Sequence, residues 1–213
     1  MRQTQLGLTL VFLLVMSGIA WAGKEAYRVV MSQDKKLCEH MLALFNADMK
    51  KGRGLEYQKH EEFIVWDPVD TGELPIHRDC RKTLTQTFDI NNDRTDELVI
   101  RTRHCYKDQL TDSLYVFPFN SNAVKLFKEH SPQVWDAAIG SIDFQTYELK
   151  KMPGVGDSAL FPSISRSILE SFKFGQTFYV SMTDLRQEFI VIAKYLRDEE
   201  IDDVCYFRGK PLI

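Results

Sequence analysis

The chain has 213 residues, with 27 Lys and Arg against 30 Asp and Glu and a formal net charge of −3. This balance excludes the clustered positive charge that nucleic-acid binding needs, because that affinity comes from Lys and Arg releasing counterions. It gives no support for binding to a membrane surface either.

The first 22 residues have the layout of a secretory signal peptide. Arg2 precedes an apolar run from Leu6 to Ile19, and Ala20-Trp21-Ala22 places small residues at the −3 and −1 positions of a cleavage site. The run is shorter than the roughly 20 residues of a membrane span. We therefore predict a periplasmic or extracellular protein without membrane insertion, whose single domain covers residues 23–213. An uncleaved N-terminal anchor is the alternative.

Periodicity predicts one helix near the start of this domain. Leu37, Met41, Leu44 and Phe45 recur at the spacing of one helix face. We place an amphipathic helix over Asp34–Lys50, with Ser32 or Asp34 as its N-cap and Gly52 as its stop.

Most of the remaining chain is predicted to be β-structure, with a short helix over Ala123–Glu129 and no single period in Ser131–Phe161. The predicted strands are Glu62–Trp66, Arg81–Phe88, Leu98–Tyr106, Ser113–Phe119, Ser171–Phe174, Thr177–Met182, Phe189–Leu196 and Val204–Phe207. Short connections join the last four, which predicts an antiparallel meander. The expected fold class is α+β: mainly antiparallel β-sheet, with hairpins, a C-terminal meander and an N-terminal amphipathic helix.

An acidic loop lies between two of these strands. Asp89, Asn91, Asp93, the Thr95 carbonyl and Glu97 fall at positions 1, 3, 5, 7 and 9 of a calcium loop. Calcium takes six to eight oxygen ligands, and alternate placement in a wound loop turns successive oxygens toward one centre. We predict a structural calcium site formed by these five residues.

The stretch DINNDRTDELVI, from Asp89 to Ile100, resembles the Asp/Asn-rich loop of FG-GAP or VCBS-type repeats, which are integrin-like calcium-binding β-hairpins. The resemblance covers one copy and about a dozen of the 213 residues, whereas those families stack several copies into a propeller. It implies the ligands named above, with Thr95 contributing its backbone oxygen. Arg94 stands where calcium loops carry Gly, and Ile100 stands where an EF-hand carries Glu, which excludes an EF-hand. A hairpin turn held by Asn and Asp hydrogen bonds, without metal, is the alternative.

Four cysteines, an even number in an exported protein, predict two structural disulfides. If Phe88 faces Glu97, Cys80 lies opposite Cys105, which leaves Cys38 to pair with Cys205. The apolar pattern instead favours Phe88 beside Leu98, and that register places Cys80 and Cys105 on opposite faces. A bulge in the loop would reconcile the two patterns.

Catalytic motifs are sparse: the five histidines are scattered, and neither HExxH nor GxSxG occurs. We expect a non-catalytic domain, and not an enzyme, that binds another protein, as an inhibitor or an immunity-type protein does. The alternative is an envelope hydrolase whose acidic loop supplies catalytic carboxylates or a metal. The FG-GAP resemblance suggests a third role, as a subunit of a surface adhesion assembly.

Overall fold

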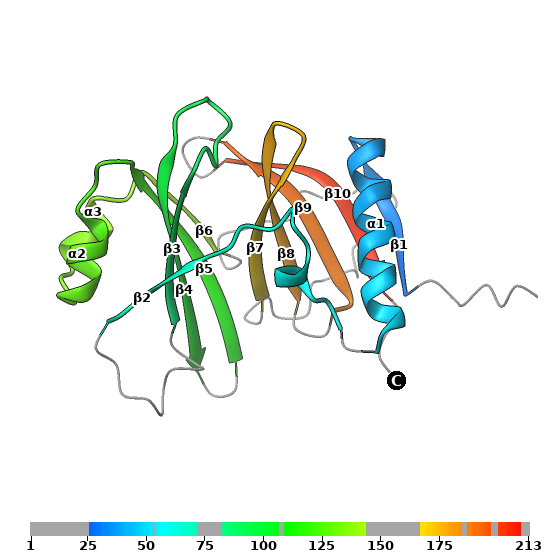
Figure 1. Cartoon of the computed structure of the whole chain (residues 1–213), viewed down its shortest axis with the longest axis horizontal. Coiled ribbons are helices and arrows are strands. Elements are labelled where there is room, and N and C mark those ends of the chain that lie inside the picture. Colours follow the sequence, from blue (N-terminus) through cyan, green and yellow to red (C-terminus); the bar gives the residue numbers. More distant parts are fainter. Residues whose placement is uncertain are drawn as a thin grey trace, which may run out of the picture.

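The computed structural model describes residues 26–52, 54–71, 82–106, 109–143, 167–184, 187–196 and 200–209. The predicted signal peptide and Cys80 lie outside these residues, as does the whole segment from 144 to 166. The elements, in chain order, are β1 Tyr27–Ser32, α1 Lys35–Lys50, the 3-10 helix η1 Tyr57–Lys59, β2 Asp67–Val69, β3 Lys82–Phe88, β4 Glu97–Tyr106, β5 Gln109–Pro118, α2 Ala123–Lys128, α3 Gln133–Asp136, β6 Gly140–Asp143, β7 Ser167–Phe174, β8 Thr177–Asp184, β9 Phe189–Tyr195 and β10 Ile201–Gly209 (Figure 1).

Within these residues the strands form one sheet with the order β1-β10-β9-β8-β7-β5-β4-β3-β2, and β6 also pairs with β5. Pairing is antiparallel throughout, except that β5 and β7 are parallel and share one register pair, Thr111 with Ser167. The sheet therefore has a first half, β2 to β6, and a second half, β7 to β10 with β1. We call the boundary between β5 and β7 the seam.

The core has three parts. One cluster combines Val99, Leu114 and Val116 of the first half with Val180 and Val191 of the second, so the sheet bends around it. A second cluster lies between α1 and the outer face of the second half, and a third lies between α2, α3 and the outer face of the first half. Figure 1 shows these helices at opposite ends of the molecule.

Helix α1 agrees with the predicted range of Asp34–Lys50. The Asp34 side chain caps it by accepting a hydrogen bond from the Leu37 N–H at 3.0 Å. Leu37 and Phe45 are fully buried against the second half of the sheet, where the Phe45 ring meets that of Phe207. The amphipathic spacing of the sequence is therefore the spacing of this buried face. No helix among the described residues is long and apolar enough to cross a membrane.

A disulfide joins Cys38 of α1 to Cys205 of β10, with a Cα–Cα distance of 5.6 Å. This confirms one of the two predicted bridges. The other, between Cys80 and Cys105, stays a prediction because Cys80 lies outside the described residues.

The hairpin of β3 and β4 has the register in which Phe88 faces Glu97. The register that places Phe88 beside Leu98 is wrong. Leu98, Val99 and Ile100 are all buried because β4 is covered on both faces, so its apolar residues do not mark one face alone.

Two differences from the expected elements concern the start of the domain. Strand β1 was not expected, and it pairs with β10 at the edge of the sheet. The predicted strand at Glu62–Trp66 is reduced to a single bridge between Phe63 and Phe172, and β2 begins only at Asp67. The segment crosses from one half of the sheet to the other, so it cannot pair with either along its whole length.

Candidate functional site

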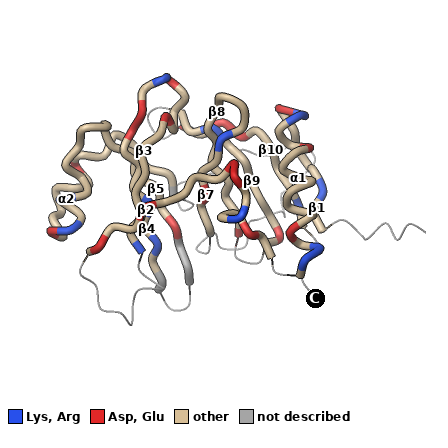
Figure 2. Tube along the Cα trace, in the orientation of Figure 1, with Lys and Arg blue, Asp and Glu red and all other residues tan. Residues whose placement is uncertain are grey.

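The acidic loop is wound around its own carboxylates. Both oxygens of Asp89 accept backbone N–H groups, from Asp93 at 2.8 Å and from Arg94 at 2.9 Å. Arg94 has φ = 73°, the left-handed conformation that calcium loops place at their Gly position. Thr95 is exposed and donates its N–H to Asp93. Red segments in Figure 2 mark the acidic residues of this turn, next to β3.

The centre of the loop is held by the side-chain amide of Asn91. Its Nδ2 donates to Glu97 Oε1 at 2.8 Å and to Asp93 Oδ2 at 3.3 Å, so this donor lies between the two carboxylates. The described residues contain no group of three or more His, Cys, Asp or Glu that could hold a metal ion in its present arrangement. The loop thus brings Asp89, Asn91, Asp93 and Glu97 together as a hydrogen-bonded turn, and Thr95 joins it through its backbone.

Glu97 is the buried member of this cluster. Burial, together with repulsion from Asp93, raises the pKa of Glu97 from 4.5 to about 7. Hydrogen bonds from the Ile90 N–H, at 3.1 Å, and from Asn91 offset only part of this effect.

A pocket of about 490 Å³ opens beside the loop. We call it the loop pocket. Its polar side consists of the loop residues Asn91, Asp93, Thr95, Asp96 and Glu97. The rest of its lining comes from three other parts of the chain: the end of β5 and the turn after it, the residue before β6, and β9. These residues are Val116, Pro118, Phe119, Asn120, Ile139 and Tyr195.

The floor and the rim of the loop pocket differ in exposure. Val116 and Tyr195 are buried, and Tyr195 packs so closely over Gly140 that a Cβ there would overlap its hydroxyl group. Phe119 is 65% exposed and Ile139 is 50% exposed. The pocket therefore has a fixed floor and an exposed apolar rim opposite the acidic loop. Sequence reasoning predicted only the loop side of it.

The loop is also anchored to the second half of the sheet. Asn92, with φ = 62°, accepts the N–H of Phe178 at 2.6 Å and donates to its carbonyl at 3.1 Å. The Phe88 ring lies 5.2 Å from that of Phe178. The Asn92 amide thus bonds the backbone of Phe178 as a neighbouring strand would. These bonds hold the loop against β8.

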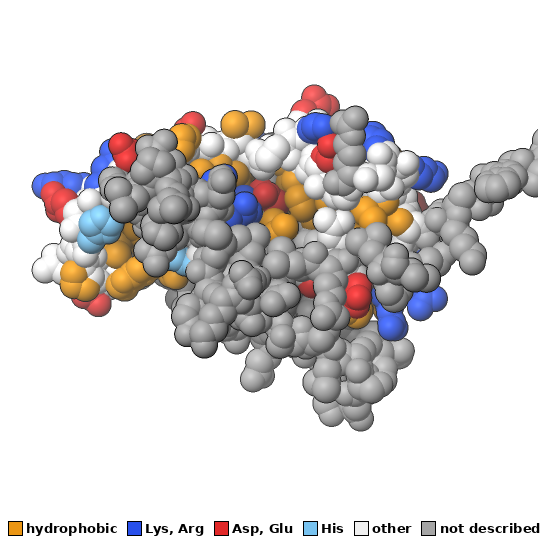
Figure 3. Space-filling view, turned by 90° about the horizontal axis from the view of Figure 1, so that it is seen from below, with side chains coloured by type: hydrophobic (Ala, Val, Ile, Leu, Met, Phe, Trp, Pro, Cys, Tyr) orange, Lys and Arg blue, Asp and Glu red, His pale blue; other side chains and the backbone are white. Residues whose placement is uncertain are grey.

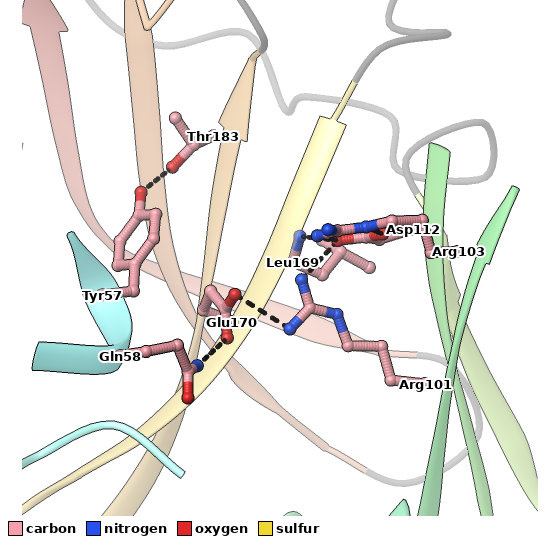
Figure 4. A network of polar contacts seen from close by, with 8 residues as sticks. All are labelled: Tyr57, Gln58, Arg101, Arg103, Asp112, Leu169, Glu170 and Thr183. Atoms are coloured by element: carbon pink, nitrogen blue, oxygen red, sulfur yellow. Dashed lines mark hydrogen bonds and ion pairs between the residues drawn. The ribbon is translucent and has the colours of Figure 1, made fainter. Parts of the chain in front are cut away.

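A buried charge network lies at the seam, and sequence reasoning missed it (Figure 4). Asp112 is fully buried. Its carboxylate forms ion pairs with Arg101, with 2.5 Å between Nη2 and Oδ2, and with Arg103, with 2.8 Å between Nε and Oδ1. Arg101 also reaches Glu170 at 2.8 Å, and Gln58 donates to the same carboxylate. The sequence does indicate it: Val99, Arg101 and Arg103 are two residues apart in a strand, so both arginines share the inward face of β4 with Val99.

The network replaces backbone pairing along the edge of β7. Ser167 pairs with β5, the Leu169 N–H donates to Asp112 at 3.2 Å, and the Ser171 carbonyl accepts the Ile64 N–H at 2.9 Å. A side-chain carboxylate therefore fills the gap between two short stretches of backbone pairing. Buried N–H groups left without a partner are costly, so this is a structural role.

The two carboxylates of the network have pKa values shifted in opposite directions. Burial would raise the pKa of Asp112, but the hydrogen bonds and charges of Arg103 and Arg101 outweigh it and hold the pKa below its ordinary value. Burial raises the pKa of Glu170, and Arg101 offsets this only in part. Asp112 is thus the carboxylate that the two arginines stabilise in its charged form.

No family model matches the chain, and no curated protein or solved structure matches it either.

Proposed function

We propose that this chain is an exported, non-catalytic domain that binds another protein through the surface around the loop pocket. The observation that carries the proposal is the exposed apolar rim formed by Phe119 and Ile139 beside the pocket. Contiguous exposed apolar side chains mark interaction sites, and aromatic residues that become desolvated on binding carry a large share of the binding energy at interfaces.

A further exposed aromatic side chain lies on α3. Trp135 of α3 is 48% exposed, and its ring contacts that of Tyr115 in a tilted arrangement with the ring centroids 4.6 Å apart. The face seen from below has hydrophobic side chains at the end of the molecule that α2 and α3 form and again near its centre (Figure 3). A rigid aromatic surface loses little entropy on binding, which suits a partner protein. One form of this function that we propose is to bind and inhibit a toxin that acts in the envelope, as an inhibitor or an immunity-type protein does.

Phe119→Ser is expected to abolish capture of the partner. The residue is exposed, so its loss removes contact area from the binding surface without opening the core. Residues 23–213 of the wild-type chain and of the variant are immobilised, exposed to envelope extract and compared by quantitative mass spectrometry.

Val65→Ser is the matched control, because Val65 is 72% exposed and does not line the loop pocket. A protein enriched by the wild type and by Val65→Ser, but not by Phe119→Ser, supports the proposal. A partner that Phe119→Ser retains in full, or no enriched protein at all, contradicts it.

For the acidic loop we propose a structural calcium ion held by Asp89, Asn91, Asp93, Glu97 and the Thr95 carbonyl. The hard oxygens of these residues suit calcium, and the left-handed Arg94 gives the loop the turn that such sites use. The Asn91 amide must then present its oxygen, because its Nδ2 now lies between the carboxylates. Calcium would take the place between the carboxylates that this neutral N–H donor now occupies.

Calcium is expected to stabilise the wild-type chain. With a dissociation constant of about 1 mM, typical of extracellular sites, 10 mM calcium adds about 1.4 kcal/mol and raises Tm by about 3–5 °C. Differential scanning fluorimetry in calcium against EDTA measures the shift. Asp89→Ala should lose it and Asp67→Ala, an exposed Asp on β2, should keep it. An unchanged Tm at 10 mM calcium, or an equal shift in Asp89→Ala, argues against the site.

One observation favours the hydrolase alternative: Asp93 and Glu97 both line the loop pocket. Paired carboxylates in one pocket can divide the roles of acid and base. Hydrolysis of an envelope polymer that is lost in Asp93→Ala, with an unchanged unfolding midpoint, would favour this function over binding.

A further inference from the structure

The charged residues that line the loop pocket are all acidic. Three of its lining residues, Asp93, Asp96 and Glu97, carry carboxylates, and none of the described residues that line it is Lys, Arg or His. Glu97 and Asp93 are fixed by the hydrogen bonds of the loop, while Asp96 is exposed at the rim and has no ion-pair partner among the described residues. An unopposed carboxylate at the mouth of a pocket favours a cation there.

The opposite wall is apolar. Phe119 and Ile139 form an exposed rim, and the floor at Val116 and Tyr195 is buried and fixed. The volume of about 490 Å³ lies within the range of roughly 300–1,000 Å³ that is typical of pockets for small ligands. The long aliphatic stem of Arg or Lys suits such a pocket, because it packs on apolar walls while its charged head contacts carboxylates.

We propose that the loop pocket binds a basic side chain, Arg or Lys, from a segment of the partner protein, with its cation at Asp96 and the apolar neighbours of the basic residue on Phe119 and Ile139. This inference rests on the proposed function and adds the chemistry of the partner to it.

Two peptides that differ only in charge test the inference. They are acetyl-Leu-Arg-Leu-amide and acetyl-Leu-citrulline-Leu-amide, in which a neutral urea replaces the guanidinium group. Each is titrated into the ¹⁵N-labelled mature chain in EDTA, so that the acidic loop holds no calcium and has the same charge in both titrations. The arginine peptide is expected to shift the amide signals of Asp96, Phe119 and Ile139 and to bind about fivefold more tightly than the citrulline peptide.

Asp96→Asn is the matched variant, because it removes one charge from an exposed position and keeps the side-chain shape. It should reduce the affinity for the arginine peptide to that for the citrulline peptide, while Asp67→Asn should change nothing. Equal affinities of the two peptides, shifts elsewhere on the surface, or no binding at several millimolar would overturn the inference.

Failure of this inference can be told from failure of the proposed function. If partner capture is lost in Phe119→Ser but unchanged in Asp96→Asn, the binding surface stands and the basic side chain is wrong. If capture is lost in both variants, both proposals are supported.

Discussion

Asp112→Asn is expected to lower the free energy of unfolding by about 3–5 kcal/mol, because it removes the carboxylate that Arg101 and Arg103 share and leaves Glu170 alone to balance two arginine charges. Arg101 has a side chain only 3% exposed, so water cannot replace the lost carboxylate. The Leu169 N–H loses its charged acceptor as well. Urea unfolding followed by tryptophan fluorescence measures the change in midpoint.

Asp67→Asn serves as the control, because it makes the same chemical change at an exposed position of the same sheet. It should alter the free energy of unfolding by less than about 0.5 kcal/mol. An Arg103→Gln/Asp112→Asn double variant should cost less than the sum of the single variants, because the two groups share one interaction. A loss in Asp112→Asn no larger than that of the control contradicts a stabilising role at the seam.

Replacing Cys38 and Cys205 together by Ala is expected to cost about 4 kcal/mol. The bridge closes a segment with a sequence separation of 167 residues, and the removal of so long a cross-link frees a large ensemble of unfolded conformations. The helix α1 and the strand β10 that it joins both belong to the core of the second half. Urea unfolding of the double variant, compared with the oxidised wild-type chain, gives the difference.

The reduced wild-type chain separates two causes of this loss. In reducing agent neither chain has a disulfide, so the wild type and the double Ala variant should then unfold at nearly the same midpoint if the missing cross-link is responsible. A double Ala variant that is much less stable than the reduced wild type would instead point to a packing defect at the buried thiols, which are at most 1% exposed.

Local patterns predicted the elements that depend on neighbours in the chain. The cap at Asp34 and the apolar spacing up to Phe45 predicted α1. The turn residues between the last strands predicted the meander, which the antiparallel pairing of β7 to β10 confirms. Strand β1 could not be predicted in this way. Its partner, β10, lies at the other end of the chain, and a single short edge strand carries little periodicity.

The candidate site was predictable only in part, for the same reason. The spacing from Asp89 to Glu97 marked the loop because its residues are neighbours in sequence. Phe119, Ile139 and Tyr195 meet the loop through the bend of the sheet, which no local pattern contains. The contact of Arg101 with Glu170 likewise depends on the parallel junction of β5 and β7.

The seam has a consequence for the order of folding. The hairpins within each half close over short distances in sequence, whereas the seam joins Ile64 to Ser171 and Asp112 to Leu169, contacts of high sequence separation. Closing long loops slows folding, so each half can form its hairpins before the seam closes. Docking of the two halves would then be the late step. In that case, substitutions at Asp112 accelerate unfolding more than they slow folding.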